Sequence, residues 1–177
     1  MMLGRVESSF GRKSPKAISP RWQALLGKTS AAYSIRCRHA RFLKIMAIVD
    51  RHGLPLAVST HAANHHEVRL VQLCFDFYMV EAKPENLIGD RAYDSDPLDH
   101  ALRQDGIEMI APHRSNRTKP PTQDRRRLRR FLRRWLVERF FAWIQWQRRI
   151  LVRWEYHPEN FLGFVQLACL VVLFRRF

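Results

Sequence analysis

Two acidic residues in this chain stand where carboxylates could hold a metal ion. Asp90 directly follows the apolar stretch 87–89, which predicts a short buried strand. In open α/β sheets, ligands gather beyond the carboxyl ends of the strands. Glu138 lies in the middle of a predicted helix that is rich in arginine and aromatic residues. Because carboxylate oxygens bind divalent cations such as Mg²⁺, the pair suggests metal-dependent chemistry.

Each acid also has a simpler interpretation. An aspartate after a strand can cap a turn or a helix, although Asp94 and Asp96 directly precede the next helix and are better placed to do so. Glu138 can form an ion pair with Arg134, four residues before it on the same helix. The helical repeat places five side chains within about 60° of Glu138: Phe131, Arg134, Trp135, Ala142 and Gln145.

The charge of the chain favours a polyanionic partner. Lysine and arginine number 31 against 16 acidic residues, which gives a net charge of +15, and the isoelectric point is near 10.9. Such a field attracts DNA or RNA. Seven arginines crowd one ten-residue stretch and cannot all form salt bridges, so phosphate contact is their simplest use and a solvated face the alternative. They are Arg125, Arg126, Arg127, Arg129, Arg130, Arg133 and Arg134.

Other residue types give no sign of a zinc site, a disulfide framework or a membrane span. Cys37, Cys74 and Cys169 are widely spaced and are expected to be free thiols in a reducing cytosol. The histidines at 61, 65 and 66 lack a matching Cys/His pair, which favours polar or capping roles. No signal peptide is expected, and the apolar run 161–174 is too short to cross a bilayer.

The pattern of elements predicts an α/β fold with a mixed sheet flanked by helices. We expect residues 1–42 to form a basic, irregular N-terminal segment and residues 43–177 to form the folded domain. A turn at Asp50 to Gly53 should join two strands into a hairpin, and Asn64 and Glu67 could begin the next helix as a capping box. The remaining expected elements are strands at 86–90 and 107–112 and helices at 95–104, 126–152 and 159–174.

Three segments, in this order, resemble the DDE transposases of bacterial insertion sequences, whose catalytic domain is RNase H-like. They are residues 50–56, 87–94 and 134–143. The resemblance implies that Asp90 and Glu138 are the second and third acids of a catalytic triad and ligands of Mg²⁺ or Mn²⁺. The family's helix signature is Tyr, Arg, Glu and Lys, and the matching positions here are Phe131, Arg134, Glu138 and Gln145. Gln145 therefore stands where a lysine is expected to help hold DNA.

The resemblance also shows a departure. The family's first acid sits on the first core strand, before the hairpin, and residues 1–49 contain only Glu7. We therefore expect an incomplete RNase H-like domain, its first strand missing or replaced. Such a chain would be a C-terminal piece, either a truncated copy or the second frame of a split gene.

These features predict a function in DNA transposition, through metal-dependent DNA strand cleavage and transfer, by a chain that is truncated and inactive alone. The alternative is a non-catalytic DNA-binding protein derived from a transposase; a basic RNA-binding or ribosome-associated protein is a third possibility. The expected partners are double-stranded DNA at transposon ends and either a second copy or a complementary N-terminal transposase chain. The expected location is the bacterial cytoplasm, on the nucleoid and not at a membrane.

Overall fold

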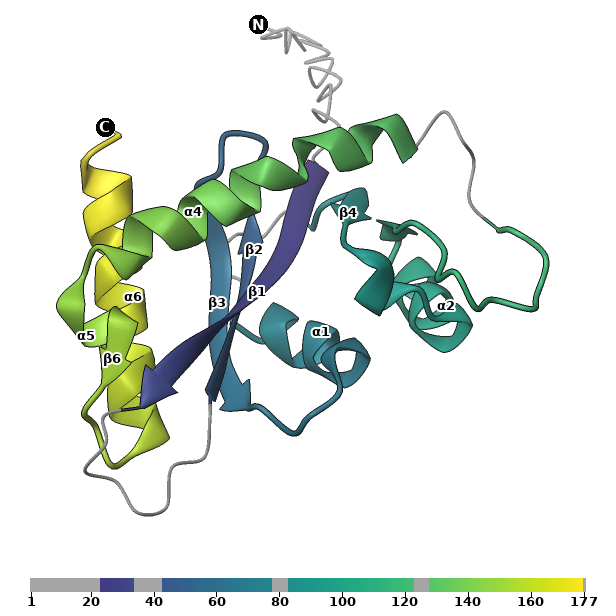
Figure 1. Cartoon of the computed structure of the whole chain (residues 1–177). Coiled ribbons are helices and arrows are strands. Elements are labelled where there is room, and N and C mark those ends of the chain that lie inside the picture. The colour runs from purple at the N-terminus through teal and green to yellow at the C-terminus, as the bar shows by residue number, and fades with distance from the viewer. Residues whose placement is uncertain (1–22, 34–42, 78–82, 123–127, 177) are drawn as a thin grey trace, which may run out of the picture.

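A mixed β-sheet lies at the centre of the computed structural model, which describes residues 23–33, 43–77, 83–122 and 128–176. The strand order is β3-β2-β1-β4-β5, and a short sixth strand pairs with the far end of β1. Figure 1 shows this sheet with helix α4 running across it. The strands are β1 (Gln23–Tyr33), β2 (Leu43–Val49), β3 (Pro55–Ala62), β4 (Asn86–Ile88), β5 (Glu108–Ile110) and β6 (Val152–Arg153).

Strand β1 lies at the centre of the sheet, although residues 1–42 were expected to form an irregular segment. It pairs antiparallel with β2, where Leu25 faces Val49, and parallel with β4, where Leu25 faces Ile88. The boundary expected at residue 42 is therefore wrong for residues 23–33, which belong to the sheet. The first core strand was expected to be either missing or replaced. It is not missing: β1 occupies its place in the sheet and carries no acidic residue. Residues 1–22 and 34–42 lie outside the described part.

The predicted hairpin is confirmed. Strands β2 and β3 pair antiparallel around the turn at residues 50–53. The carboxylate Oδ1 of Asp50 accepts hydrogen bonds from the backbone N–H groups of His52 and Leu54, each at 2.8 Å. Gly53 adopts a φ of 83°, which a glycine tolerates without steric cost. Asp50 is thus a turn aspartate.

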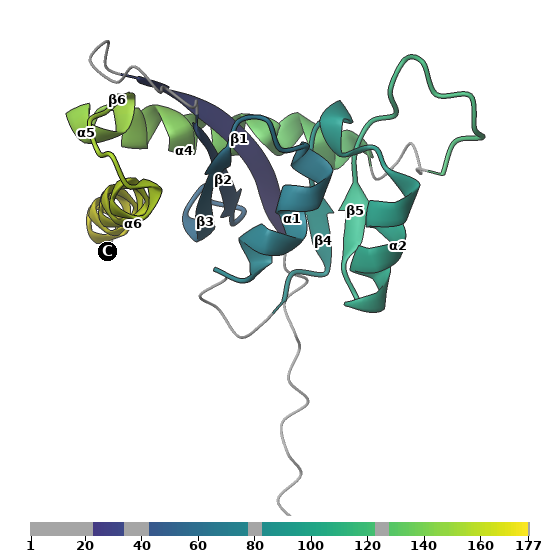
Figure 2. The same ribbon diagram turned by 90° about the horizontal axis from the view of Figure 1, so that it is seen from below.

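Helices cover both faces of the sheet and enclose two cores. On one face, α1 (Glu67–Phe75) and α2 (Asp96–Gln104) pack against side chains such as Leu26 and Leu87. On the other, α4 (Trp135–Gln145), α5 (Arg148–Leu151) and α6 (Pro158–Phe174) pack against side chains such as Leu25. Figure 2 shows α1 and α2 across the sheet from α4. None of the described helices is long and apolar enough to cross a membrane.

Two helix predictions need correction, and one short helix was not predicted. The N-cap of α1 is His66 rather than Asn64, and its Nδ1 accepts a hydrogen bond from the backbone N–H of Val68. A short 3₁₀ helix, η1 (Arg91–Tyr93), follows β4. The single helix expected at 126–152 is divided into η2 (Arg129–Arg134), α4 and α5, because Gln147 adopts an extended conformation, with φ −82° and ψ 115°. This break turns the chain so that β6 can reach β1.

Candidate active site

Asp90 follows β4 and caps the next turn. Its Oδ1 accepts a hydrogen bond of 2.9 Å from the backbone N–H of Ala92, at the start of η1. The capping interpretation therefore holds for Asp90 itself. Asp94 and Asp96, which were favoured for that role, instead bind the loop after β5. The second carboxylate oxygen of Asp90 has no partner among the described residues and remains able to accept a ligand. The side chain lies at a shallow pocket that Phe131 and Arg134 also line.

Glu138 projects from α4 toward solvent, with 60% of its side chain exposed. The predicted ion pair is confirmed, since Nη2 of Arg134 lies 2.9 Å from Oε1 of Glu138. An exposed pair of this kind contributes at most about 1 kcal/mol to stability. Arg134 also lines the pocket at Asp90. Arg134 therefore pairs with one of the two acids that the sequence singled out and lines the same pocket as the other.

The neighbouring part of β1 offers no third carboxylate. Leu25 of β1 faces Ile88 of β4 in a parallel pair, so continuing this register by two residues would bring Gly27 beside Asp90. A Cβ atom on Gly27 would lie 2.6 Å and 2.8 Å from the two methyl groups of Val137, and 3.2 Å from the ring of Phe141. The packing of α4 on β1 thus fills the space that a side chain would need.

The donor set does not fit the complete metal site that the family resemblance implies. Within the described residues, no group of three or more histidines, cysteines, aspartates or glutamates could hold a metal ion. Asp90 and Glu138 supply two carboxylates, one already hydrogen-bonded and the other paired with Arg134. The guanidinium paired with Glu138 also opposes the binding of a second cation there by charge repulsion.

Two residues of the histidine cluster make polar and capping contacts of the predicted kind. Nε2 of His61 lies 2.8 Å from Oγ of Ser59, and His66 caps α1. The two described cysteines, Cys74 and Cys169, are free and buried, and burial raises their pKa values to about 11 and about 12. Thiols with such pKa values stay protonated and unreactive near neutral pH.

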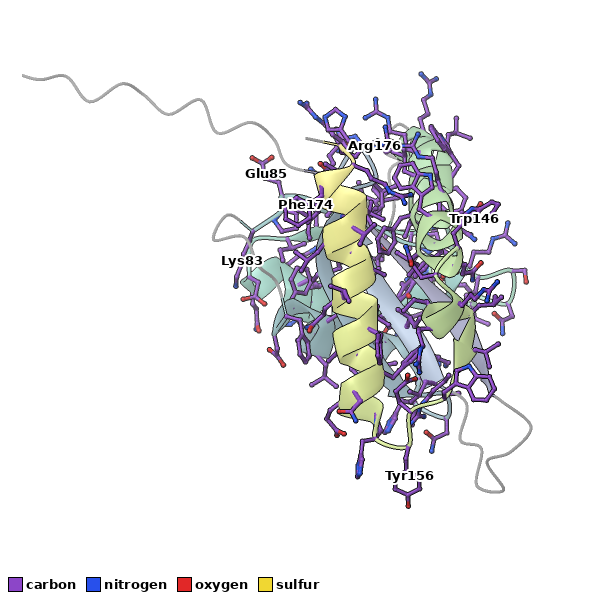
Figure 3. The ribbon with its side chains drawn as sticks, turned by 90° about the vertical axis from the view of Figure 1, so that its left-hand side faces the viewer. Lys83, Glu85, Trp146, Tyr156, Phe174 and Arg176 are labelled. Atoms are coloured by element: carbon purple, nitrogen blue, oxygen red, sulfur yellow. The ribbon has the colours of Figure 1, made fainter. Side chains whose placement is uncertain are left out.

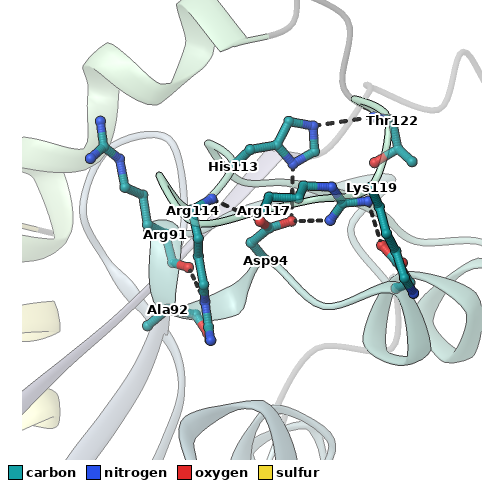
Figure 4. Close-up of polar contacts among 9 residues, drawn as sticks. Arg91, Ala92, Asp94, His113, Arg114, Arg117, Lys119 and Thr122 are labelled. Carbon is teal, nitrogen blue, oxygen red and sulfur yellow. Dashed lines mark hydrogen bonds and ion pairs between the residues drawn. The ribbon is translucent and has the colours of Figure 1, made fainter.

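A network that the sequence did not reveal anchors the loop after β5 next to Asp90 (Figure 4). Asp94 accepts hydrogen bonds of 2.8 Å from the backbone N–H of Arg114 and from Nη1 of Arg117, and it contacts Nδ1 of His113 at 3.0 Å. Arg117 also bonds to Asp96 at 2.7 Å. His113, in the loop after β5, is therefore part of this network.

The pKa of Asp94 reflects the network. Burial opposes ionisation of this carboxyl, but the hydrogen bond from the Arg114 backbone and the nearby His113 and Arg117 outweigh it. The pKa therefore lies below its usual value. The ionised network holds residues 113–117 against η1, and it fixes the backbone from which Asp90 projects.

The predicted DNA-binding arginines are only partly described. Arg125, Arg126 and Arg127 lie outside the described residues. Nη1 of Arg130 donates a hydrogen bond of 3.1 Å to Oδ1 of the buried Asn86, so it ties η2 to the start of β4. Arg129 is exposed and has no partner among the described residues, which leaves it available to phosphate. Gln145, the last residue of α4, is half-buried.

Comparison with known proteins agrees with this geometry. Residues 10–173 match the family model of the transposase DDE domain. The chain is 29% identical over 133 residues to a protein of Burkholderia cepacia assigned as the transposase for insertion sequence element IS402, covering 71% of this chain and 59% of the relative. It is 30% identical over 134 residues to the corresponding protein for IS6501 of Brucella ovis, covering 75% of this chain and 98% of the relative.

A solved structure supports the fold. The chain superposes on a chain of the simian T-cell lymphotropic virus intasome with a TM-score of 0.52, at 14% identity, covering 85% of this chain and 47% of the other. The fold is thus the RNase H-like mixed sheet flanked by helices that the sequence predicted. By its family match, its relatives and its fold, this chain belongs to the DDE-domain transposases of insertion sequences.

Proposed function

We propose that this chain derives from a transposase that carries out DNA transposition, and that the chain alone binds DNA without cleaving it. The observation that carries the proposal is the first strand, which is present at the centre of the sheet but has no acid, with Gly27 packed against Val137. The chain also spans 59% of its IS402 relative. Metal-dependent strand cleavage and transfer is therefore the activity we assign to the complete transposase.

Asp90 and Glu138 are, in this proposal, the remaining catalytic acids. In a complete site they would help hold Mg²⁺ or Mn²⁺, which activates the attacking oxygen and stabilises the leaving one. Here two carboxylates, one of them paired with Arg134, supply too little negative charge and too few ligands to hold such a metal ion. A complementary N-terminal transposase chain could restore the missing acid only by displacing β1 from between β2 and β4, where it forms two sets of ladder hydrogen bonds.

DNA binding is the activity that the described chain can retain. The net charge of +15 provides the attraction. Arg129 and Arg134, together with Arg125, Arg126 and Arg127, would contact backbone phosphates, and Gln145 would lie at the edge of the same surface. Transposon ends are the expected target, and the nucleoid in the bacterial cytoplasm is the expected location.

A salt titration tests this proposal. The affinity for a labelled DNA duplex, measured by fluorescence anisotropy, should fall linearly on a log–log plot against salt concentration. Unlabelled duplex DNA should compete better than unlabelled RNA hairpins, which separates the proposal from RNA binding. Absent or salt-insensitive binding would overturn the DNA-binding part.

A further inference from the structure

A second cationic surface lies beside α4. It is a pocket of about 630 Å³ between the β2–β3 turn, α4 and the end of α6. Four arginines from three separate segments line it, together with a histidine and a tryptophan. These residues are Arg51, His52, Arg133, Trp135, Arg139 and Arg176. We refer to it below as the turn pocket.

Arg139 forms the rigid floor of the turn pocket. Its guanidinium lies 4.6 Å from the ring centroid of Trp135 and 4.7 Å from that of Trp143. Nη2 donates a hydrogen bond of 2.7 Å to the backbone oxygen of His52. This approach depends on Gly53, since a Cβ there would lie 3.2 Å from Nη2 of Arg139. Aromatic rings and a carbonyl therefore hold the cation in place, with no carboxylate.

The other cations of the turn pocket are also free of described acids. Nε of Arg51 donates to Nε2 of His52 at 3.0 Å, and Arg176 lies over the ring of Trp143 at 4.5 Å. The side chain of Arg133 makes no hydrogen bond or ion pair with a described residue. The nearby Asp50 directs its Oδ1 to the backbone of its own turn. The positive charge is consequently not neutralised by any described carboxylate.

Arg139 and Glu138 project in different directions from α4. Successive helical residues are rotated by about 100°, so Arg139 points about 100° away from Glu138, and Leu136 lies within about 60° of Arg139. Figure 3 shows Arg176 beyond the end of α6 and close to α4. Of the described arginines in the cluster that precedes α4, Arg133 alone lines the pocket.

We propose that the turn pocket binds a phosphate group of the DNA backbone. Guanidinium groups recognise phosphate by charge-assisted hydrogen bonds, and the guanidinium of Arg139 is already held in place by its two indole rings and the His52 carbonyl. Arg51 and Arg176 close over the bound phosphate from the turn and from α6. The inference rests on the proposed DNA binding and adds a second contact, beyond the arginine cluster and Gln145.

The test uses Arg51→Gln and Arg176→Gln, singly and together. Both side chains belong to residues exposed outside α4, so these changes leave the arginine cluster and the sheet intact. The matched control is Arg103→Gln, which removes the same charge from an exposed position on α2, across the sheet. Anisotropy titrations with a labelled duplex over a range of salt concentrations give both the affinity and the salt slope.

Each pocket variant should reduce the salt slope by about 1 and weaken binding about fivefold near 0.15 M salt, because one phosphate contact is lost. The control should change the slope by less than half as much. Pocket variants that titrate like Arg103→Gln would overturn the turn pocket while leaving DNA binding itself established. A wild-type chain that fails to bind the duplex would refute the proposed function, and the inference with it.

Discussion

The contact between Gly27 and α4 makes a quantitative prediction about β1. In open space, Gly→Ala typically stabilises a protein by about 0.4–1 kcal/mol, because it restricts the unfolded chain. Here the added methyl group would lie 2.6 Å and 2.8 Å from the methyl groups of Val137. Overpacking of this kind costs about 1–3 kcal/mol. We expect Gly27→Ala to lower the free energy of unfolding by about 1–2 kcal/mol.

A double-mutant cycle isolates the contact. Val137→Ala alone should cost about 2 kcal/mol, from the lost burial of its methyl groups and the space they leave. In the double variant that space accommodates the new methyl group at residue 27. The combined loss should therefore be smaller than the sum of the single losses by about 1–2 kcal/mol.

Urea denaturation followed by tryptophan fluorescence measures all four free energies of unfolding. Gly163→Ala on α6 is the matched control, because a Cβ there meets nothing within 4 Å, and it should stabilise by about 0.5–1 kcal/mol. If Gly27→Ala is neutral or stabilising, and additive with Val137→Ala to within about 0.3 kcal/mol, α4 does not pack on β1 as described. The reason given for the missing acid would then fail.

Three further predictions concern charged and polar groups. Burial raises the pKa of Asp99 to about 6, so ionisation of this carboxyl costs stability as the pH rises through that value. Asp99→Asn should therefore raise the urea midpoint at pH 8 but not at pH 4. An equal gain at both pH values would refute this prediction. Asp94 has a lowered pKa, so its stabilisation is present above pH 3.8 and is lost as the pH falls further. Asp94→Asn should therefore cost about 1–3 kcal/mol at pH 7 in the same assay, and the loss should shrink in acid, whereas a loss independent of pH would contradict it. Gln145→Lys should steepen the salt slope of DNA binding by about 1, and an unchanged slope would remove Gln145 from the DNA surface.

Most of the elements that position the two acids could be predicted from local sequence. The hairpin has a turn aspartate and a glycine at its centre, α2 has a proline in its first turn, and α6 begins at Pro158. The strand before Asp90 is a short apolar run. These signals depend only on neighbouring residues, which is why the elements and the ion pair of Glu138 with Arg134 were predicted correctly.

Strand β1 escaped prediction because a central strand need not alternate. Ala24, Leu25 and Leu26 are buried on both faces of the sheet, so they form a continuous apolar run, which equally suits one helical turn. The expected long helix breaks at Trp146 and Gln147, where neither a glycine nor a proline indicates a helix end. After the break, β6 pairs with β1, a tertiary contact that no local pattern encodes.

The two side-chain assemblies around the sheet depend on contacts between distant residues. His113 meets Asp94 across 19 positions of sequence, and Arg139 meets His52 across 87. No local pattern encodes such contacts. An available signal for the first was the concentration of cations at 113–119 shortly after the acids at 94 and 96.

In the proposed function, this chain retains the fold of a DDE transposase without a working catalytic site. The most direct test is nicking of supercoiled plasmid DNA by the purified chain in Mg²⁺ or Mn²⁺, beside Asp90→Asn and Glu138→Gln variants, with DNA binding measured on the same samples. We expect all three proteins to bind the DNA without nicking it above background. Metal-dependent nicking by the wild-type chain that is lost in both variants would show a complete site and contradict the account.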